Sequence, residues 1–353
     1  MDETEVSDRL TIALDAMGGD AAPRMVIAGA NIARRRYPHV NFLIFGREAE
    51  VAPLLNRMKR LQAVTTFVHT EDVVGSEDKP SIALRGGRKS SMRLAINAVQ
   101  DGRAAGVVSA GNTGALLAMA KFVLKTLPGV DRPAIAGFFP TLHGESLMLD
   151  LGANLVCSAR NLVDFAVMGS AFARCVLGVM QPTCGLLNVG SEELKGHEAL
   201  QEAAATLRAA NLPGEFVGFI EGDDIARGTV DVVVADGFTG NVALKTAEGT
   251  AKLVGEYMRV TFKSSLMAGI GYLMARSSLK KLRKRLDPRR YNGAIFLGLN
   301  GIAVKSHGGA DAFGFANAIG VAVDMNEHDI IEKTKADFAA LTASAPGLRA
   351  ATG

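Results

Sequence analysis

Hydrophobic residues recur in short runs of strand length from one end of the chain to the other. These runs span residues 10–14, 40–45, 106–108, 134–139, 146–149, 185–188, 216–220, 230–235 and 294–299. Most are followed by a Gly-rich turn and then by a stretch of helical period, as at 91–99, 114–124, 162–177, 197–209 and 240–257. Continuously apolar strands are buried on both faces, as in a parallel sheet, and alternation with helices is typical of layered α/β proteins. The pattern predicts a mostly parallel sheet with helices on both faces.

The domain organisation follows from the evenness of this pattern. No Pro/Ser linker, internal repeat or low-complexity stretch divides the chain, so we expect one α/β domain over residues 10–340. Residues 1–9 begin with an acidic stretch unlike a secretory signal and read as a disordered lead-in, and 341–353 read as a flexible tail. The uncharged stretch 104–120 contains polar residues and Gly, which predicts a loop between apolar elements rather than a membrane span.

The amino-acid composition excludes several classes of protein. Of 353 residues, 48% are hydrophobic, which excludes a disordered chain. Three Cys in this length cannot form a disulfide scaffold, and a reducing, cytoplasmic location is expected. The net charge of +3 gives no reason to expect nucleic-acid binding.

Six strand-to-helix junctions combine small residues with Asp, Asn, Lys or His. They are Asp15–Asp20, Ser109–Gly114, Asp150–Asn154, Asn188–Gly196, Asp236–Asn241 and Ser306–Asp311. In a parallel sheet such junctions line the carboxyl edge, where ligands bind. Helix N-termini there present N–H groups suited to phosphate, and Gly permits close approach of an anion. Any one of these loops could equally be an ordinary turn. Six together predict a polar, Gly-lined cleft.

The standard catalytic motifs are absent. The chain has no P-loop, no G-x-G-x-x-G after its first strand and no G-x-S-x-G. Cys157, Cys175 and Cys184 lack zinc-like spacing, so no metal or cofactor is expected. Cys175 and Cys184 read as core residues, whereas Cys157 follows the Asn154 loop closely enough to line the site.

The loops resemble those of the bacterial phosphate acyltransferase family PlsX. The family's motifs occur in unbroken order between about Leu10 and Val323, at Asp15–Asp20, Ser109–Ala115, Leu151–Asn154, Glu192–Gly196, Gly218–Gly222, Asp236–Asn241, Gly298–Gly301 and Lys305–Gly308. Two departures are Ala21, where the family usually has His, and Gly309–Ala310, where it has a Ser-rich turn.

The resemblance implies transfer of a long acyl chain from acyl carrier protein to inorganic phosphate, giving acyl phosphate for phospholipid synthesis. It also implies a homodimer and a fold similar to phosphotransacetylases and to isocitrate- and isopropylmalate-type dehydrogenases. Alternatives are a phosphotransacetylase that uses a short acyl-CoA, or a non-catalytic scaffold at the membrane.

Phosphate is itself a nucleophile and a thiolate is a good leaving group, so neither a Ser or Cys nucleophile nor a metal is required. We expect Lys195, Asn241 and His307 to be catalytic: Lys195 and Asn241 at the phosphate or oxyanion, His307 orienting phosphate or donating to the thiolate. Lys195 could instead be a solvated turn residue and Asn241 a helix cap. The residues expected to bind substrate are Gly18, Gly19, Asp20, Gly111, Asn112, Thr113, Asn154, Gly240 and Lys305. The carboxylates of Asp15, Asp20 and Asp236 are expected to hold loops, because they repel phosphate.

Residues 259–290 hold ten Lys or Arg and one acidic residue, with apolar residues at helical spacing. We expect a protruding helical hairpin with a Gly-softened apolar tip over 266–275. It could pack in the dimer, dock acidic acyl carrier protein, or contact an anionic membrane and a downstream membrane acyltransferase. The membrane contact would use Leu266, Met267, Ile270, Lys280, Lys281 and Arg283.

Overall fold

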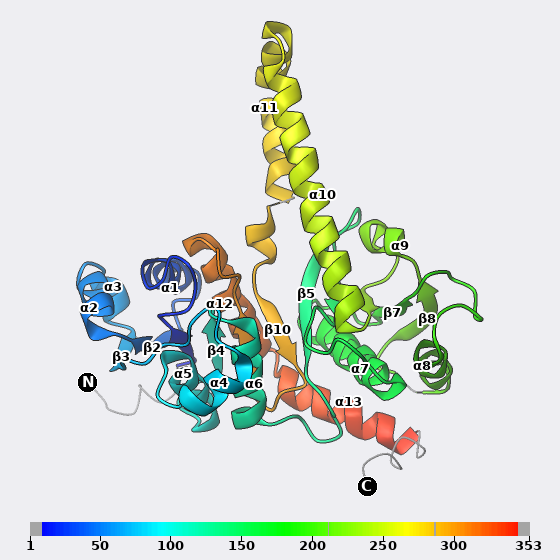
Figure 1. The fold of residues 1–353 in the computed structure, drawn as a ribbon, viewed down its shortest axis with the longest axis horizontal. Helices are drawn as coiled ribbons and strands as arrows, with labels where there is room; N and C mark the ends of the chain where they lie inside the picture. Colours follow the sequence, from blue (N-terminus) through cyan, green and yellow to red (C-terminus); the bar gives the residue numbers. More distant parts are fainter. Residues whose placement is uncertain (1–8, 211, 286, 345–353) are drawn as a thin grey trace.

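A computed structural model describes residues 9–210, 212–285 and 287–344, without the side chains of 283–285, 288 and 342–344. The predicted lead-in, except for residue 9, and residues 345–353 of the predicted tail lie outside the described residues; residues 341–344 are the end of a helix, so the tail prediction is wrong there. Figure 1 shows a broad body from which two long helices project.

Within the described residues, eleven strands form one sheet in the order β3-β2-β1-β4-β11-β10-β5-β6-β9-β7-β8. The strands are β1 (Thr11–Asp15), β2 (Asn41–Gly46), β3 (Thr65–His69), β4 (Gly106–Ser109), β5 (Ala134–Pro140), β6 (Glu145–Leu149), β7 (Thr183–Leu187), β8 (Glu215–Ile220), β9 (Val232–Val234), β10 (Ala294–Leu297) and β11 (Ile302–Lys305). The nine predicted runs all become strands, with bounds shifted by a few residues.

The strands run in opposite directions in the two halves of the sheet. β3, β2, β1, β4 and β11 are mutually parallel, and we call them the N-terminal half-sheet. β6, β9, β7 and β8 are also mutually parallel and form the C-terminal half-sheet. Between the halves, β10 is antiparallel to β11 and β5, and β5 is antiparallel to β6. The sheet is mostly parallel, as predicted, but the two half-sheets point opposite ways.

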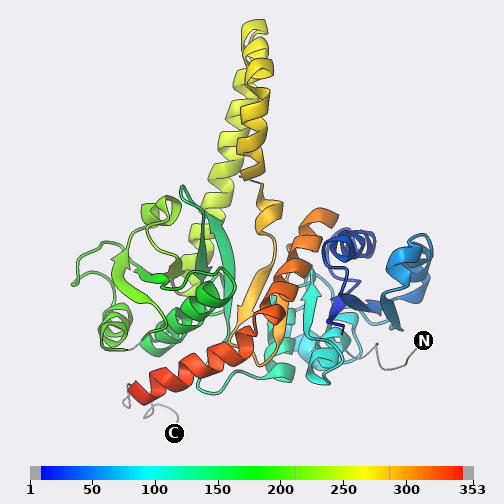
Figure 2. The ribbon, with the colours of Figure 1, turned by 180° about the vertical axis from the view of Figure 1, so that it is seen from behind.

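Helices cover both faces of the sheet. They are α1 (Arg24–Arg36), α2 (Glu48–Asn56), α3 (Lys59–Gln62), α4 (Pro80–Gly86), α5 (Ser91–Gln100), α6 (Thr113–Leu124), α7 (Ala159–Cys175), α8 (Glu198–Ala209), α9 (Gly222–Arg227), α10 (Gly237–Lys263), α11 (Leu266–Arg285), α12 (Ala312–Glu327) and α13 (Ile330–Ser344), with a 3₁₀ turn at Pro288–Tyr291. One core cluster joins α1, α7, α8, α12 and α13 to one face, and a second joins α5 and α6 to the other. Figure 2 shows α12 and α13 crossing the back of the molecule.

Two strands were not predicted, and each has a local reason. β3 is only half-buried and alternates polar with apolar residues, so it lacks a continuous apolar run. β11 is four residues long and follows β10 after a tight reversal. The predicted run 294–299 is interrupted at Gly298, whose φ of +88° ends the strand. The chain then turns back and inserts β11 between β10 and β4.

The projecting hairpin differs in detail from the prediction. α10 begins in the body at Gly237 and ends at Lys263, and α11 begins at Leu266, so the turn is formed by residues 264–265. The expected Gly-softened tip over 266–275 is wrong, since this segment is the first half of α11 and its Gly residues are helical. Near the turn, Phe262 of α10 and Tyr272 of α11 pack with ring centroids 5.4 Å apart.

Candidate active site

The loops after β1, β4 and β11 meet at one end of the N-terminal half-sheet, because these three strands are parallel neighbours. The buried side chain of Asp15 joins the first two of these loops to α5, because it accepts hydrogen bonds from the hydroxyls of Ser109 at 2.7 Å and of Ser91 at 2.6 Å. The backbone nitrogen of Asp20 donates to the carbonyl of Gly308 at 2.9 Å. We call loops 15–20, 109–114 and 306–311 the N-terminal loop group.

Glycine is required inside this group because two backbones touch. A Cβ on Gly18 would lie 2.5 Å from the nitrogen of Gly111 and 2.7 Å from a carboxylate oxygen of Asp15. Gly19 has a φ of +105°, a conformation that residues with a Cβ rarely adopt. The predicted substrate-binding glycines Gly18, Gly19 and Gly111 thus lie together, and their lack of side chains keeps the backbone open to an anion.

Lys305 places a buried ammonium group beneath these loops. Its Nζ donates to the carbonyl of Ser306 and, at 3.4 Å, to that of Ala110. Burial lowers the pKa of Lys305 to about 8, an effect partly offset by the carboxylates of Asp15 and Asp20. Burial in turn raises the pKa of Asp15, opposed by its hydrogen bonds to Ser91 and Ser109. The group therefore holds a partly desolvated cation that a phosphate could neutralise.

His307 lies at the surface of the same group. Its backbone nitrogen donates to the side-chain oxygen of Asn292 at 2.8 Å, and its ring Nδ1 accepts from the nitrogen of Gly309 at 3.0 Å. With Nδ1 acting as an acceptor, the neutral ring carries its proton on Nε2. Asn292, which also donates to the hydroxyl of Ser306, was missed by the sequence analysis because it belongs to no recognisable motif.

The start of α6 completes the N-terminal loop group. The side-chain oxygen of Asn112 accepts from the nitrogen of Ala115 at 3.0 Å and caps the helix. Its amide nitrogen donates to the carbonyls of Ser76 and Asp78, at 2.8 and 2.9 Å. The Asn112 side chain is thus engaged within the protein, and the groups left to face an anion are the first helical N–H groups, beginning with exposed Thr113.

The loops after β6, β9 and β7 belong to the C-terminal half-sheet, and we call loops 150–154, 188–196 and 236–241 the C-terminal loop group. The carboxylate of Asp150 is fully buried and accepts from the nitrogens of Ile135, Ala153 and Asn154. Burial raises the pKa of Asp150, and these N–H donors offset part of the effect. Gly240 packs directly on the carbonyl of Asp150, leaving no space for a Cβ.

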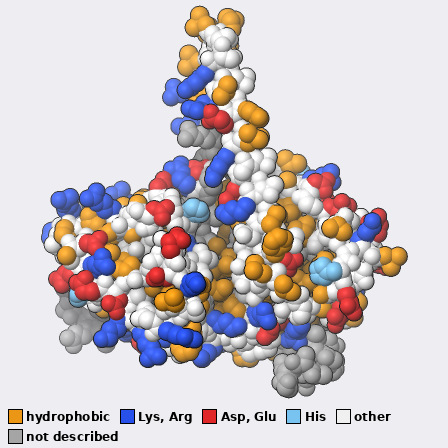
Figure 3. All heavy atoms as spheres, in the orientation of Figure 1, with side chains coloured by type: hydrophobic (Ala, Val, Ile, Leu, Met, Phe, Trp, Pro, Cys, Tyr) orange, Lys and Arg blue, Asp and Glu red, His pale blue; other side chains and the backbone are white. Residues whose placement is uncertain are grey.

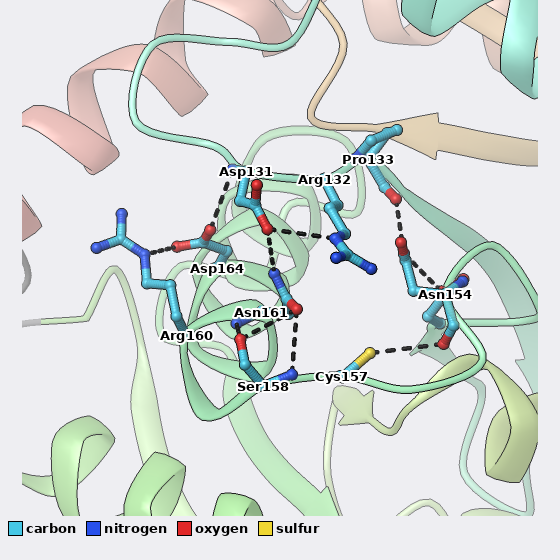
Figure 4. A network of polar contacts seen from close by, with 10 residues as sticks. Asp131, Arg132, Pro133, Asn154, Cys157, Ser158, Arg160, Asn161 and Asp164 are labelled. Carbon is cyan, nitrogen blue, oxygen red and sulfur yellow. Dashed lines mark hydrogen bonds and ion pairs between the residues drawn. The ribbon is translucent and has the colours of Figure 1, made fainter. Parts of the chain in front are cut away.

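Asn154 is buried in the C-terminal loop group, and its side chain has partners there. Its side-chain amide nitrogen donates to Asp150 and to the carbonyl of Pro133, each at 2.9 Å, and its backbone carbonyl accepts from the nitrogen of Gly237 at 2.7 Å. Figure 4 shows this arrangement beside Cys157, whose thiol donates to the Asn154 carbonyl. The arrangement favours a structural role for Asn154 over direct phosphate contact.

Cys157 is poorly suited to act as a nucleophile. Burial, reinforced by the charge of Asp150, raises the pKa of its thiol to about 12. The thiolate is the reactive form, so the thiol is inert near neutral pH. Burial raises the pKa of Cys184 to about 12 as well. Among the described residues, no group of His, Cys, Asp and Glu is arranged to hold a metal ion.

Asn241 and Lys195 are exposed members of the C-terminal loop group. Asn241 lies in the first turn of α10 against Gly152, with its Cγ 3.7 Å from the position that a Cβ of Gly152 would take. Asp236, rather than Asn241, caps this helix by accepting from the nitrogen of Thr239 at 2.9 Å. The turn that carries Lys195 is held by Asn188, whose amide donates to the Lys195 carbonyl at 3.2 Å. Both side chains can therefore meet a substrate.

The prediction that all six loops share one carboxyl edge is wrong. Because β6, β9 and β7 run opposite to β1, β4 and β11, the two loop groups follow strands that point in opposite directions. Continuous apolar runs indicate burial but carry no information about strand direction. Figure 3 shows the front face hollowed between the two halves of the molecule, below the base of the hairpin.

A polar network at the start of α7 holds the segment to which the C-terminal loop group is hydrogen-bonded. The guanidinium of Arg160 donates to buried Asp164 at 2.7 Å, and Asn161 donates to Asp131 at 3.0 Å (Figure 4). Burial raises the pKa of Asp164 to about 7, against the effect of Arg160. Asp131 lies two residues before Pro133, so the network fixes the segment to which Asn154 is bonded. Sequence reasoning missed it because its members come from separate segments.

The sequence matches known proteins over most of its length. A model of the family described as "Fatty acid synthesis protein" matches residues 10–333. The phosphate acyltransferase of Rhodospirillum centenum is 65% identical over 339 residues, covering 96% of this chain and 96% of that protein. The phosphate acyltransferase of Paramagnetospirillum magneticum is 61% identical, covering 94% of this chain and 95% of that protein.

The chain belongs to the phosphate acyltransferase family. It is therefore an enzyme, as its loops and the resemblance predicted.

Among solved structures, the EutD phosphotransacetylase from Staphylococcus aureus aligns with a TM-score of 0.58 at 17% identity, covering 90% of this chain and 94% of that chain. A phosphotransacetylase from Streptococcus pyogenes gives 0.58 at 17% identity, covering 93% and 99%. At this identity the likeness shows the fold alone, and it confirms the predicted fold class.

Proposed function

We propose that the enzyme transfers a long acyl chain from acyl carrier protein to inorganic phosphate, and that the acyl phosphate serves phospholipid synthesis. The observation that carries the proposal is Lys305, a buried cation among Gly-lined loops of a phosphate acyltransferase. The inert thiol of Cys157 supports direct attack by phosphate rather than a cysteine intermediate.

In the proposed reaction, a phosphate oxygen forms a bond to the thioester carbonyl carbon and generates a tetrahedral oxyanion. Collapse breaks the carbon–sulfur bond, and the departing thiolate takes up, through solvent, the proton that the attacking hydrogen phosphate gives up, while His307 Nε2–H can donate a hydrogen bond to the sulfur. Lys305 and the first N–H groups of α6 hold the phosphate. The products are acyl phosphate and the free thiol of the carrier.

Lys195 and Asn241 are proposed to stabilise the oxyanion from the C-terminal loop group, because both are exposed donors, Lys195 on a turn held by Asn188 and Asn241 near the start of α10. One well-placed donor contributes about 3–4 kcal/mol to the transition state. Positioning the two reactants supplies about 7–11 kcal/mol more. Neither contribution requires a metal or a covalent intermediate.

The experiment that tests this function measures acyl phosphate formation from phosphate with palmitoyl-acyl carrier protein or with acetyl-CoA. The proposal expects turnover with the acyl carrier protein to exceed that with acetyl-CoA by orders of magnitude. Comparable or faster turnover with acetyl-CoA would assign the enzyme a phosphotransacetylase activity instead. A protein that consumes neither thioester in a phosphate-dependent way would contradict both.

We further propose a cytoplasmic enzyme that touches an anionic membrane through its hairpin, where it could hand its product to a membrane acyltransferase. Leu266 and Met267 are 83% and 75% exposed next to the turn, with no core against them. Among the described residues, no helix is both long and apolar enough to cross a membrane. Contact through an exposed apolar tip would therefore be peripheral.

The geometry of α11 constrains how the hairpin could meet lipid. Lys280 and Lys281 are exposed, and the Arg283 side chain is outside the described part of the structure. Lys280 lies fourteen residues beyond Leu266, about 20 Å along a helix that rises about 1.5 Å per residue. An interfacial helix is immersed by only about 5–10 Å. Simultaneous contact by Leu266 and Lys280 thus requires the hairpin to lie along the membrane surface.

The homodimer is also a proposal. Exposed apolar side chains along α10, among them Val254, Tyr257 and Val260, offer a surface that a second copy could cover.

A further inference from the structure

A second basic surface lies on the body of the molecule, over α4, α5 and α6. Residues 79–125 contain eight Lys or Arg and a single acidic residue, Asp101. In the described residues, no ion pair joins an acidic group to any of six of these cations, and all but half-buried Arg93 are exposed; the six are Arg85, Arg88, Lys89, Arg93, Lys121 and Lys125. We call these six the α4–α6 basic surface. Figure 3 shows Lys and Arg side chains gathered along this lower part of the front face.

An exposed aromatic ring lies at the centre of this surface. Phe122 is 54% exposed, with the guanidinium of Arg93 at 5.1 Å and the ammonium of Lys125 at 4.9 Å from its ring centroid. Burial and the neighbouring charge of Arg88 lower the pKa of Arg93, which shows that these cations repel one another. A surface that keeps like charges together around an exposed ring has the composition of a protein docking site.

The surface adjoins the N-terminal loop group. Pro80, the first residue of α4, lies against Gly114 in the first turn of α6, 2.7 Å from the position of a Cβ there. The amide of Asn112 holds the preceding segment through Ser76 and Asp78. A cavity of about 460 Å³ opens beside α4, lined by residues including Arg47, Asp78, Ile82 and Gly87. A partner seated on α4–α6 is thus next to the candidate phosphate site.

We propose that the α4–α6 basic surface is the docking site for the acidic carrier protein that delivers the acyl group, an inference that rests on the proposed function. Charge complementarity selects an acidic partner, and the neighbouring loops give its thioester a short path to the phosphate. A membrane is a poorer occupant, because the surface lies low on the body while the hairpin projects from the opposite side (Figure 1). A membrane that touched only the end of the hairpin would not reach this surface.

The test compares charge reversals in steady-state kinetics without membranes. Arg88→Glu/Lys121→Glu should raise KM for palmitoyl-acyl carrier protein by roughly tenfold or more and weaken its salt dependence, with kcat little changed. Turnover of palmitoyl-pantetheine, which lacks the carrier, should stay at the wild-type value. The matched control Arg57→Glu/Arg60→Glu reverses two exposed charges on another part of the body and should change neither. The milder Arg88→Gln/Lys121→Gln should show a smaller shift in the same direction.

Three results would overturn the docking site in an enzyme that does use acyl carrier protein. One is an unchanged KM in Arg88→Glu/Lys121→Glu. Another is a larger KM increase in the hairpin variant Lys280→Glu/Lys281→Glu, which would move the docking site to α11. The third is that Arg88→Glu/Lys121→Glu no longer sediments with anionic vesicles while its KM for palmitoyl-acyl carrier protein is unchanged. That result would make the surface a membrane contact. Wild-type enzyme that consumes no acyl carrier protein would instead refute the proposed function, so the two failures are distinguishable.

Discussion

The Asp150 carboxylate accepts two hydrogen bonds from Asn154, one from its backbone nitrogen at 2.6 Å and one from its side-chain amide at 2.9 Å. The same amide also bonds the carbonyl of Pro133, so Asn154 joins two backbone segments around a buried charge. A residue held in this way contributes first to folding.

Asn154→Ala should therefore destabilise the protein by about 2–3 kcal/mol, because it leaves a buried carboxylate and a buried carbonyl short of donors. Urea unfolding measures this loss.

Asn241→Ala and Lys195→Ala remove exposed side chains and should leave the free energy of unfolding within about 0.5 kcal/mol of wild type. Their kcat should instead fall by about a hundredfold, as for loss of an oxyanion donor. Near-wild-type turnover in these two variants would remove them from the catalytic set.

Lys305 should make activity depend on pH. Its pKa of about 8 means that the cation is lost as pH rises through 8, so kcat/KM for phosphate should fall on the alkaline side. In Lys305→Met, kcat/KM for phosphate should be about a hundredfold lower at pH 7 and should not fall further as the pH rises. Lys305→Arg keeps its charge to far higher pH and should retain binding of phosphate above pH 8 if it folds. A wild-type profile that stays flat between pH 7 and 9 would contradict a role for the cation.

The same shift in pKa predicts a stability change of definite sign. Folded Lys305 loses its proton near pH 8, whereas the ordinary value of 10.5 applies in the unfolded chain. Between these values the unfolded state binds more protons, so stability attributable to this group rises with pH, by roughly 3 kcal/mol over the window. Below pH 8 its contribution is a constant cost. Urea unfolding from pH 7.5 to 10.5 should show this rise in wild type relative to Lys305→Met, and parallel curves would count against it.

Two glycines of α10 should respond oppositely to the same substitution. Gly240→Ala forces a methyl group into the carbonyl of Asp150 and should destabilise by at least about 2 kcal/mol, with displacement of the helix start. Gly249→Ala adds a methyl group where no atom lies within 4 Å and should stabilise the helix by up to about 1 kcal/mol. Thermal unfolding compares them directly, and equal effects would refute the close approach at Gly240.

Vesicle sedimentation tests the hairpin. Leu266→Glu/Ile270→Glu should weaken binding to anionic vesicles by at least about tenfold, because each immersed side chain contributes about 1.5–3 kcal/mol. Met180→Glu alters an equally exposed apolar residue on the body and should have no effect. Binding that survives Leu266→Glu/Ile270→Glu, or that is absent in the wild type, would exclude lipid contact through the tip.

The sequence predicted the strands and the loops better than their arrangement. Runs such as 40–45 and 106–108 are apolar because both faces of those strands are covered, and periodicity reports coverage directly. Strand direction depends on crossovers between distant segments, so the reversal at β10, β5 and β6 left no local signal. β3 was not predicted because its side chains are only partly buried and therefore do not form a continuous apolar run.

The candidate site was predictable where glycine is required and unpredictable where side chains meet from afar. The approach of Gly18 to Gly111 underlies the Gly-rich loops that were singled out. Asn112 was expected to bind phosphate with its backbone N–H group, and the sequence held no sign that its side-chain amide bonds a segment more than thirty residues earlier. Asn292, Asp131 and Asp164 were missed for the same reason, since each has a hydrogen-bond partner remote in sequence: Ser306, Asn161 and Asp131 respectively.

The place of β11 in the sheet has a consequence for how the protein is made. β11 is the last strand of the described part of the chain, yet it lies in the middle of the sheet between β4 and β10. A ribosome must therefore deliver some 300 residues before the two half-sheets can be joined. β11 also carries Lys305, so the cation proposed to hold phosphate arrives with the strand that closes the sheet. A nascent or C-terminally truncated chain would expose unpaired strand edges and lack the phosphate-holding cation, which links completion of synthesis to onset of activity.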